Sequence, residues 1–368
     1  MSNPLIRLGE LGQSPWFDNI THDLITSGKL ARLIRDDGLL GMTSNPSIFE
    51  KAVANTDVYD DLIRRSADEG KDGAAIFEAI AVSDVQLACD VFRPTWEQTK
   101  GVDGNVSIEV SPGVGNDTRG SIEEAERLWK SVDRPNVMVK IPGTPEGIPA
   151  IEHCLAEGIN INITLLFSIE RYAEVIEAFL KALETRVAKG QPIDRLHSVA
   201  SFFVSRVDTK IDPQLDKLGD PKHIRGKIAI ANAAMAYRLF ESTLASPRWQ
   251  ALAAKGARPQ RPLWASTSTK DPRYPDVYYV EALIAPHTVN TMPPETFDAY
   301  RDHGKPEVRI HQAIDAAPAQ LAALEASGIS LAQATRELEV EGVEKFGTAF
   351  GSLLKGVEAK VGELAGSH

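Results

Sequence analysis

The stretch 136-NVMVKIPGT-144 places a lysine inside a run that otherwise has the composition of a buried strand. Four of the six residues from Asn136 to Ile141 are apolar, and three of these are β-branched, which favours an extended backbone. A buried ammonium group is costly unless it is paired or neutralised. The position of Lys140 therefore needs an explanation from the strands around it.

Two other runs share the pattern of this stretch, in which one face is aliphatic and the opposite face is largely polar. Successive side chains of a strand point to opposite faces. The aliphatic faces hold Val106, Ile108, Val110, Val137, Val139, Ile141, Ile161, Ile163 and Leu165. The opposite faces hold Ser107, Glu109, Met138, Lys140, Asn160, Asn162 and Thr164. We expect helices to cover the aliphatic faces and the polar groups to converge inside a barrel.

Short runs predicted as strands alternate with longer helical patterns along the chain. The strands are expected at 14–18, 38–43, 106–110, 136–141, 159–167, 197–203, 262–266 and 279–284. The helices are expected at 121–133, 169–189, 222–245, 307–326 and 330–364. Such alternation implies parallel strands joined by right-handed crossovers. The predicted fold is therefore α/β, a (β/α)8 TIM barrel with additional helices after the last strand, and a doubly wound open sheet is the alternative.

The domain organisation follows from the lengths of the connections. Residues 44–105 and 207–261 are long enough to carry extra helices, and helices from about 293 to 368 are expected to pack on the barrel. No linker or repeat divides the chain, so we predict a single domain over residues 1–368. The helix at 121–133 is expected to begin with a capping box formed by Ser121 and Glu124.

Composition excludes several classes of protein. The 368 residues are 43% hydrophobic and 25% charged, which is ordinary for a globular protein, and the net charge of −11 argues against general nucleic-acid binding. Two cysteines, Cys89 and Cys154, make no disulfide framework and suit a reducing compartment. The N-terminus lacks a signal-peptide pattern, and no window approaches the roughly 18 apolar residues of a membrane span. We expect a cytoplasmic protein without membrane or nucleic-acid partners.

The polar residues late in the three strands indicate chemistry at the carboxyl end of the barrel, where such folds build their sites. A lysine enclosed there can lose its proton and attack a carbonyl carbon to form a Schiff base. Glu109 could then relay protons through a water held by Thr164. The alternative is a buried Glu109–Lys140 ion pair with no catalytic role, in which each charge only neutralises the other, although such a pair adds little net stability.

Further candidates lie in the loops. Asn45, in the polar turn after the second strand, is placed to bind a substrate hydroxyl or to serve the turn itself. Asp18 ends the first strand and has either an acid/base role or a helix N-cap role. Arg206, Lys270 and Arg273 are candidates for a phosphate contact, the alternative being solvated surface charge. The sequence has no P-loop, no HExxH and no histidine cluster, so we predict neither metal nor cofactor.

Six motifs together resemble the transaldolases, over roughly Asp18 to Pro293. They are GMTSNPSIF, SIEVSPGVGNDT, VMVKIPGTPEGIPAI, EGININITLLFS, SVASFFVSRVDTKID and ASTSTKDPRYPD. The resemblance, to the bacterial, actinobacterial-like type, implies a barrel with metal-free class I chemistry. It implies transfer of a dihydroxyacetone unit from sedoheptulose 7-phosphate or fructose 6-phosphate to an aldose phosphate, in the pentose phosphate pathway.

Roles of single residues follow from the same resemblance. Lys140 matches the Schiff-base lysine, Asp18 the acid/base, and Glu109 with Thr164 the pair that holds the catalytic water. Asn45, Asn162 and Ser201 match groups that bind the dihydroxyacetone hydroxyls. Arg206 and Ser266 match phosphate contacts. The family often has an arginine shortly after that serine, and this chain has Lys270 instead.

Two rival functions remain. A fructose 6-phosphate aldolase uses the same lysine but releases the dihydroxyacetone. Glu109 and Phe203 favour transaldolase, because the aldolases resemble Gln and Tyr at these positions. A non-catalytic sugar-phosphate-binding protein is the rival from another class. We expect sugar phosphates as partners and a monomer or a homodimer.

Overall fold

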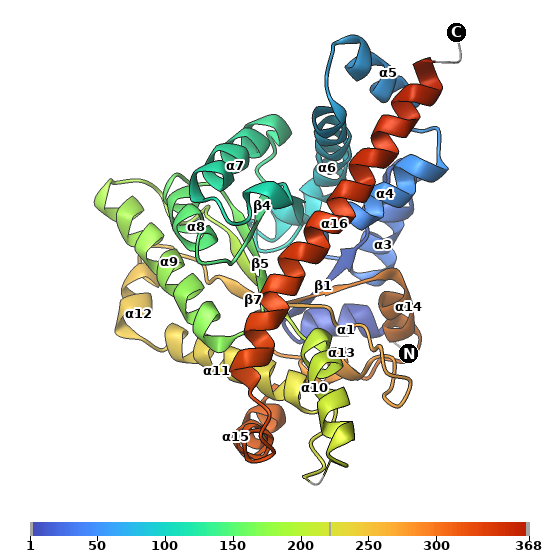
Figure 1. Cartoon of the computed structure of the whole chain (residues 1–368). Helices are drawn as coiled ribbons and strands as arrows, with labels where there is room; N and C mark the ends of the chain where they lie inside the picture. The colour runs from blue at the N-terminus through green and yellow to red at the C-terminus, as the bar shows by residue number, and fades with distance from the viewer. Residues whose placement is uncertain (1–2, 221, 366–368) are drawn as a thin grey trace.

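The computed structural model describes residues 3–220 and 222–365, and within them eight parallel strands close into a barrel in the order β1 to β8 (Figure 1). The predicted barrel is thereby confirmed. The strands are β1 (Gln13–Asp18), β2 (Gly41–Thr43), β3 (Asn105–Glu109), β4 (Val137–Pro142), β5 (Ile161–Leu166), β6 (Ser198–Phe203), β7 (Arg261–Ala265) and β8 (Thr288–Met292).

Helices surround the barrel and fill the two long connections, as expected. Ahead of β4 lie α1 (Pro4–Glu10), α2 (His22–Thr26), α3 (Lys29–Asp37), α4 (Pro46–Asn55), α5 (Asp60–Asp68), α6 (Gly73–Gln98), the 3-10 turn η1 (Pro112–Val114) and α7 (Thr118–Val132). Between β4 and β7 lie α8 (Gly147–Ala156), α9 (Ile169–Ala188), α10 (Ser205–Lys217), α11 (Ile228–Leu244) and α12 (Pro247–Ala253). The remainder are α13 (Tyr278–Ala282), α14 (Pro294–His303), α15 (Ile310–Ala326) and α16 (Leu331–Ala365). No helix of residues 3–220 or 222–365 is both long and apolar enough to cross a membrane.

The last strand was predicted in the wrong place. Residues 279–284 lie in α13 and the loop after it, and β8 begins only at Thr288. The buried residues of this segment are Tyr279, Val280, Leu283 and Ile284, a spacing that follows the helical period. Inside β8 the apolar Val289 and Met292 are separated by polar residues, which conceal the strand in the sequence.

The predicted capping box at Ser121 and Glu124 is also wrong. Helix α7 begins three residues earlier, and the Oδ1 of Asp117 accepts a hydrogen bond from Gly120 N at 3.1 Å. Glu124 instead accepts from the Ser111 backbone N at 2.8 Å and from its Oγ at 2.9 Å. An earlier aspartate satisfies the free N–H groups, so Glu124 ties the loop after β3 to α7.

The two faces of the barrel strands separate as the alternation predicts. Val106, Val139 and Ile163 belong to the main core between strands and helices. A second apolar cluster fills the barrel interior, and it consists of Trp16, Met138, Val199, Leu263, Ala265 and Val289.

Leu165 departs from the predicted alternation. The register of β5 shifts between Ile163 and Leu166, and Leu165 has a φ of 59°, which is uncommon for a residue with a branched side chain. Its side chain consequently lines the cavity at the carboxyl end of the barrel as well as contacting the core.

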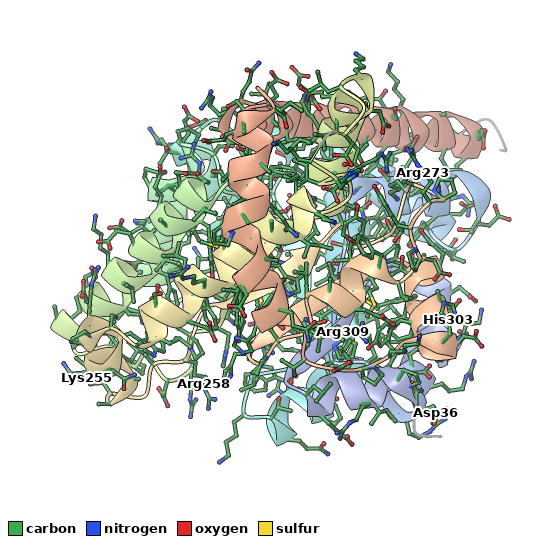
Figure 2. The ribbon with its side chains drawn as sticks, turned by 90° about the horizontal axis from the view of Figure 1, so that it is seen from below. Asp36, Lys255, Arg258, Arg273, His303 and Arg309 are labelled. Atoms are coloured by element: carbon green, nitrogen blue, oxygen red, sulfur yellow. The ribbon has the colours of Figure 1, made fainter. Side chains whose placement is uncertain are left out.

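Helix α16 lies across that same end of the barrel (Figure 1, red). A Cβ atom built on Gly342 would meet the Cδ2 of Leu165 at 3.1 Å, so a glycine lets the helix approach the end of β5 closely. The view from below shows α16 along one edge of the molecule and the labelled Lys255 and Arg258 toward the opposite edge (Figure 2).

Candidate active site

Glu109 and Lys140 face each other on neighbouring strands inside the barrel. They are paired in the β3–β4 register, and Lys140 Nζ donates to Glu109 Oε2 at 3.0 Å. Only 11% of the Lys140 side-chain surface and 10% of the Glu109 side-chain surface are exposed. Burial raises the pKa of the Glu109 carboxyl, and the neighbouring Lys140 charge works in the opposite direction. The inward face predicted for both residues is confirmed.

A chain of hydrogen bonds fixes the polar groups beside this pair. Asn162 lies opposite Lys140 in the β4–β5 register. Its Nδ2 donates to Ser107 Oγ at 2.9 Å, and its Oδ1 accepts from Ser201 Oγ at 2.6 Å. Three strands are thus joined through one buried amide, whose orientation is determined by its two partners.

Asp18 is held by side chains and does not cap a helix. Its Oδ1 accepts from Thr43 Oγ1 at 2.7 Å, and its Oδ2 accepts from Asn45 Nδ2 at 3.4 Å. Helix α2 is capped instead by Thr21, which accepts from Leu24 N at 3.3 Å. The N-cap interpretation of Asp18 is therefore wrong, and its carboxylate faces the cavity.

A cavity of about 410 Å³ opens at the carboxyl end of the barrel and gathers the predicted residues. Its wall includes Asp18, Asn45, Glu109, Lys140, Thr164, Ser201, Phe203, Arg206, Ser266 and Lys270. Among the predicted residues, Asn162 and Arg273 do not line it, and the Asn162 amide is fully buried with Ser107 and Ser201 as its hydrogen-bond partners. Ten side chains from several strand ends and loops therefore share one enclosure, which is the arrangement of barrel active sites.

Thr164 offers an unused hydroxyl to this cavity. Its Oγ1 is buried, and it has no hydrogen-bond partner among residues 3–220 and 222–365. A buried hydroxyl without a partner costs about 1–3 kcal/mol. In a wall that also contains Glu109 and Lys140, such a group is suited to binding a water or a substrate hydroxyl.

The cavity wall also carries cations that have no carboxylate partner within the described residues. The Arg206 guanidinium lies 4.9 Å from the centre of the Phe203 ring, and within the described residues it forms no salt bridge. Burial lowers the pKa of Arg206, and the Asp18 charge partly offsets this. Ser266, with a φ of 55°, forms a 2.9 Å hydrogen bond with Ser205.

The structure separates Lys270 from Arg273. Lys270 lies on the cavity wall, whereas Arg273 is exposed and pairs with Asp271 at 3.0 Å and with Asp216 at 3.4 Å. Arg273 is not part of the wall, so of these two candidates only Lys270 is placed to meet a ligand there.

Several wall residues were missed in the sequence. Thr291 and Glu295 come from β8 and α14, and Gly342, Lys345, Phe346 and Ala349 come from α16. Thr291 was missed because the last strand was predicted at residues 279–284 and not at β8. The α16 residues recur at helical spacing, but nothing local distinguishes them from other faces of a long helix.

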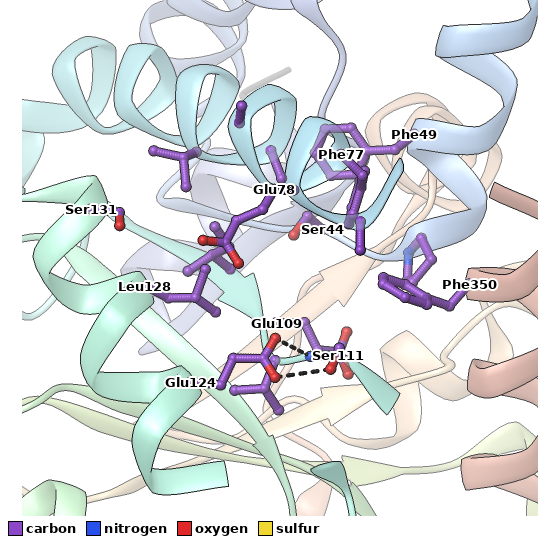
Figure 3. A pocket seen from close by; sticks show the side chains of 18 of the residues that line it. Ser44, Phe49, Phe77, Glu78, Glu109, Ser111, Glu124, Leu128, Ser131 and Phe350 are labelled. Carbon is purple, nitrogen blue, oxygen red and sulfur yellow. Dashed lines mark hydrogen bonds between the residues drawn. The ribbon is translucent and has the colours of Figure 1, made fainter. Parts of the chain in front are cut away.

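A larger cavity, of about 580 Å³, also has Glu109 on its wall (Figure 3). Phe49, Phe77 and Phe350 form much of its wall, and its charges are already paired. Arg127 binds Glu78 at 2.6 Å and lies 3.6 Å from Glu124. Lys140 does not line this cavity, so we place the candidate active site in the smaller one. Within the described residues, no group of three or more His, Cys, Asp or Glu is placed to hold a metal ion.

Comparison with known proteins agrees with this geometry. The family model for transaldolase/fructose-6-phosphate aldolase matches residues 15–357. The chain belongs to this family. The matched region ends inside α16, and Gly342 and Lys345 of this transaldolase/aldolase family member lie within it.

Similar chains are known from several bacteria. A transaldolase of Acidothermus cellulolyticus is 51% identical over 361 residues, covering 97% of this chain and 96% of its own length. A transaldolase of Frankia alni is 47% identical, with 98% of each chain covered. A transaldolase of Trichodesmium erythraeum is 45% identical, with 99% of each chain covered.

Proposed function

We propose that this family member is a transaldolase, a transferase that moves a dihydroxyacetone unit from sedoheptulose 7-phosphate to glyceraldehyde 3-phosphate. The products are erythrose 4-phosphate and fructose 6-phosphate. The observation that carries the proposal is the enclosed Lys140–Glu109 pair in a cavity that also holds Asp18 and the free Thr164 hydroxyl. The relatives named transaldolase, at 45–51% identity over nearly the whole chain, support the same activity.

The first half of the proposed reaction breaks a carbon–carbon bond. Lys140 Nζ gives up a proton to Glu109, the resulting neutral amine attacks the donor C2 carbonyl, and loss of water gives an iminium. Asp18 takes the proton from the C4 hydroxyl, the C3–C4 bond breaks, and its electron pair moves into the iminium to give an enamine. The aldose phosphate leaves, and the dihydroxyacetone unit stays attached to Lys140.

The second half reverses these steps on the acceptor. The enamine carbon attacks the aldehyde carbon of glyceraldehyde 3-phosphate, and Asp18 returns its proton to the new hydroxyl. Water then adds to the iminium and releases Lys140 and the product. Glu109 and Thr164 hold the water for the proton transfers to and from nitrogen, and Asn45 and Ser201 orient the hydroxyls of the dihydroxyacetone unit. Asn162 acts through Ser201, whose hydroxyl donates to its Oδ1.

The fructose 6-phosphate aldolase alternative differs in the fate of the enamine. Phe203 lies on the wall, packs against Phe167 with ring centres 5.2 Å apart, and has no hydroxyl to activate water. The enamine is therefore shielded from protonation until an acceptor arrives. A non-catalytic sugar-phosphate-binding protein has no need of an enclosed lysine.

The rest of the proposal concerns the protein as a whole. We propose one domain over residues 1–368, with the helices from about 293 to 368 packed on the barrel. Its partners are sugar phosphates, not nucleic acid or membranes, and it acts in the cytoplasm as a monomer or homodimer. The free, buried Cys89 and Cys154 suit that compartment.

Borohydride trapping tests the proposal directly. Protein treated with fructose 6-phosphate and borohydride should gain the mass of one reduced dihydroxyacetone adduct, located by peptide mass on Lys140. The variant Lys140→Met should gain none, and peptides with the cavity lysines Lys270 and Lys345 should stay unmodified. An unmodified Lys140 would overturn the enzyme proposal. Rapid splitting of fructose 6-phosphate without an acceptor would favour the aldolase instead.

A further inference from the structure

Helix α16 contributes one face to the active-site cavity. Gly342, Lys345, Phe346 and Ala349 line it, and their spacing of three, four and seven residues is that of one helix face. In Figure 1 this helix passes in front of β5 and β7, and the close approach of Gly342 to Leu165 confirms that it lies on the barrel end.

Ion pairs fix α16 in the turns before and after this face along the helix. Lys210 binds Glu337 at 2.7 Å and also Glu341, and Arg171 lies 3.3 Å from Glu339. Further along, Lys360 lies 3.1 Å from Asp57 and 3.3 Å from Asp60. The segment between these anchors is therefore held over the cavity.

Lys345 differs from these anchoring residues because no carboxylate of the described residues pairs with it. Among residues 3–220 and 222–365 it forms no salt bridge, and the same is true of Arg206 and Lys270. These three cations reach the wall from the segment after β6, the loop after β7 and the helix α16. The other charged wall residues are the Lys140–Glu109 pair, Asp18 and Glu295.

An anion suits this wall better than a neutral group. The chain has a net charge of −11, yet three cations that form no salt bridge within the described part of the chain share one cavity with the hydroxyls of Ser266 and Ser268. Arginine, lysine and hydroxyl groups together are typical ligands for a phosphate. A phosphate dianion bound there would share the cavity with cations from three separate segments of the chain.

We propose that Lys345 binds the phosphate group of the sugar phosphates together with Arg206 and Lys270, so that α16 contributes to the preference for phosphorylated substrates. This inference rests on the proposed function for its substrate class. It assigns to the C-terminal helix a specificity role in addition to its packing on the barrel.

The test compares phosphorylated and unphosphorylated acceptors. In Lys345→Gln, KM for erythrose 4-phosphate should rise about tenfold, the effect of one charged contact, with kcat little changed. With the phosphorylated donor at a saturating concentration, activity toward erythrose should stay within about twofold of the wild type. Lys345→Arg should keep most of the affinity for erythrose 4-phosphate. Lys355→Gln, at an exposed lysine of the same helix that is not on the cavity wall, should match the wild type.

A binding measurement separates this inference from the proposed reaction. Inorganic phosphate should raise the Tm of the wild type and of Lys355→Gln, and raise that of Lys345→Gln clearly less. This readout does not depend on turnover, so it remains valid even if Lys140 forms no adduct. Equal phosphate stabilisation in all three proteins, or an equal loss of activity toward erythrose and erythrose 4-phosphate, would overturn the role of Lys345.

Discussion

Lys140 Nζ lies 3.0 Å from Glu109 Oε2 because the two residues are direct partners in the parallel ladder of β3 and β4. Backbone pairing, and not side-chain flexibility, therefore sets their separation. Asp18 adds a second carboxylate to the same cavity from β1, where Thr43 and Asn45 hold it. The proposed nucleophile and both proposed proton carriers thus stand on rigid strands, which favours well-defined geometry in a reaction with repeated proton transfers.

Replacing Thr164 by valine should separate activity from stability. The buried Thr164 Oγ1 has no protein partner among the described residues, so Thr164→Val should leave the free energy of unfolding within about 1 kcal/mol of the wild type or raise it. If the hydroxyl holds the catalytic water, kcat should fall by about 10²-fold. Urea unfolding and steady-state kinetics measure the two effects.

A matched threonine provides the control for that variant. Thr267 Oγ1 is also fully buried, but it donates to Asn290 Oδ1 at 2.8 Å. Thr267→Val should lower the free energy of unfolding by about 1–3 kcal/mol, because the amide oxygen loses its partner. An unchanged kcat in Thr164→Val would remove this threonine from the mechanism.

Adding a hydroxyl at Phe203 should shift the reaction toward simple aldol cleavage. Phe203→Tyr places a donor on the wall that also holds Lys140 and Glu109, where it can orient a water to protonate the enamine. Splitting of fructose 6-phosphate without acceptor should rise about tenfold or more. Phe203→Leu, which adds no hydroxyl, is the control and should show no such rise; an equal rise in both variants would contradict the explanation.

Enlarging Gly342 should lift α16 from the mouth of the barrel. A Cβ there already meets Leu165 at 3.1 Å, so the larger side chain of Gly342→Leu has no room without movement of the helix. KM for the sugar phosphates should rise several-fold, and limited proteolysis of the C-terminal helix should become faster.

Gly347, five residues further along the same helix, is the control for this change. A Cβ built there meets nothing within 4 Å. Gly347→Leu therefore gains about the same helix propensity as Gly342→Leu, up to about 1 kcal/mol, but without a clash. Its KM and proteolysis rate should match the wild type. Identical behaviour of the two variants would show that close packing at Gly342 is not needed for substrate binding.

Asp208 should make stability depend on pH near neutrality. It accepts from Ala229 N at 2.7 Å and from Tyr279 OH at 2.9 Å, and burial, with a smaller effect of the nearby Asp212 charge, raises its pKa from 3.8 to about 7. The native state therefore holds this proton more tightly than the unfolded chain does. The resulting stability is fully present below pH 3.8 and is lost as the pH rises through about 7.

The variant Asp208→Asn should remove that dependence. As the pH rises from 4 to 8, the difference between the free energy of unfolding of the variant and that of the wild type should increase in favour of the variant by roughly 4 kcal/mol at most. One pKa unit corresponds to about 1.4 kcal/mol. Denaturant unfolding at several pH values measures this. Asp61→Asn, at a carboxylate whose side chain is 91% exposed, is the control and should run parallel to the wild type.

Much of the site was predictable because the signal is local. Alternation along 106–110, 137–141 and 160–164 shows which side chains share a face of a strand, and the structure brings Glu109 and Lys140 together as that alternation requires. The same reasoning failed at Leu165, where a register shift interrupts the alternation. It also failed at β8, whose polar residues hide a strand buried on both faces.

The sequence by itself determined the barrel, the inward position of Lys140 and Glu109, and the family, because strand period and contiguous motifs are properties of neighbouring residues. Only the tertiary structure decided that Lys270 and not Arg273 reaches the cavity, and that Lys345 joins it from a helix more than 200 residues beyond Lys140. Such choices depend on which distant segments pack together. Arg273 forms an ion pair with the nearby Asp271, and the absence of a side chain at Gly342 lets α16 approach β5. Neither effect produces a periodic pattern in the sequence.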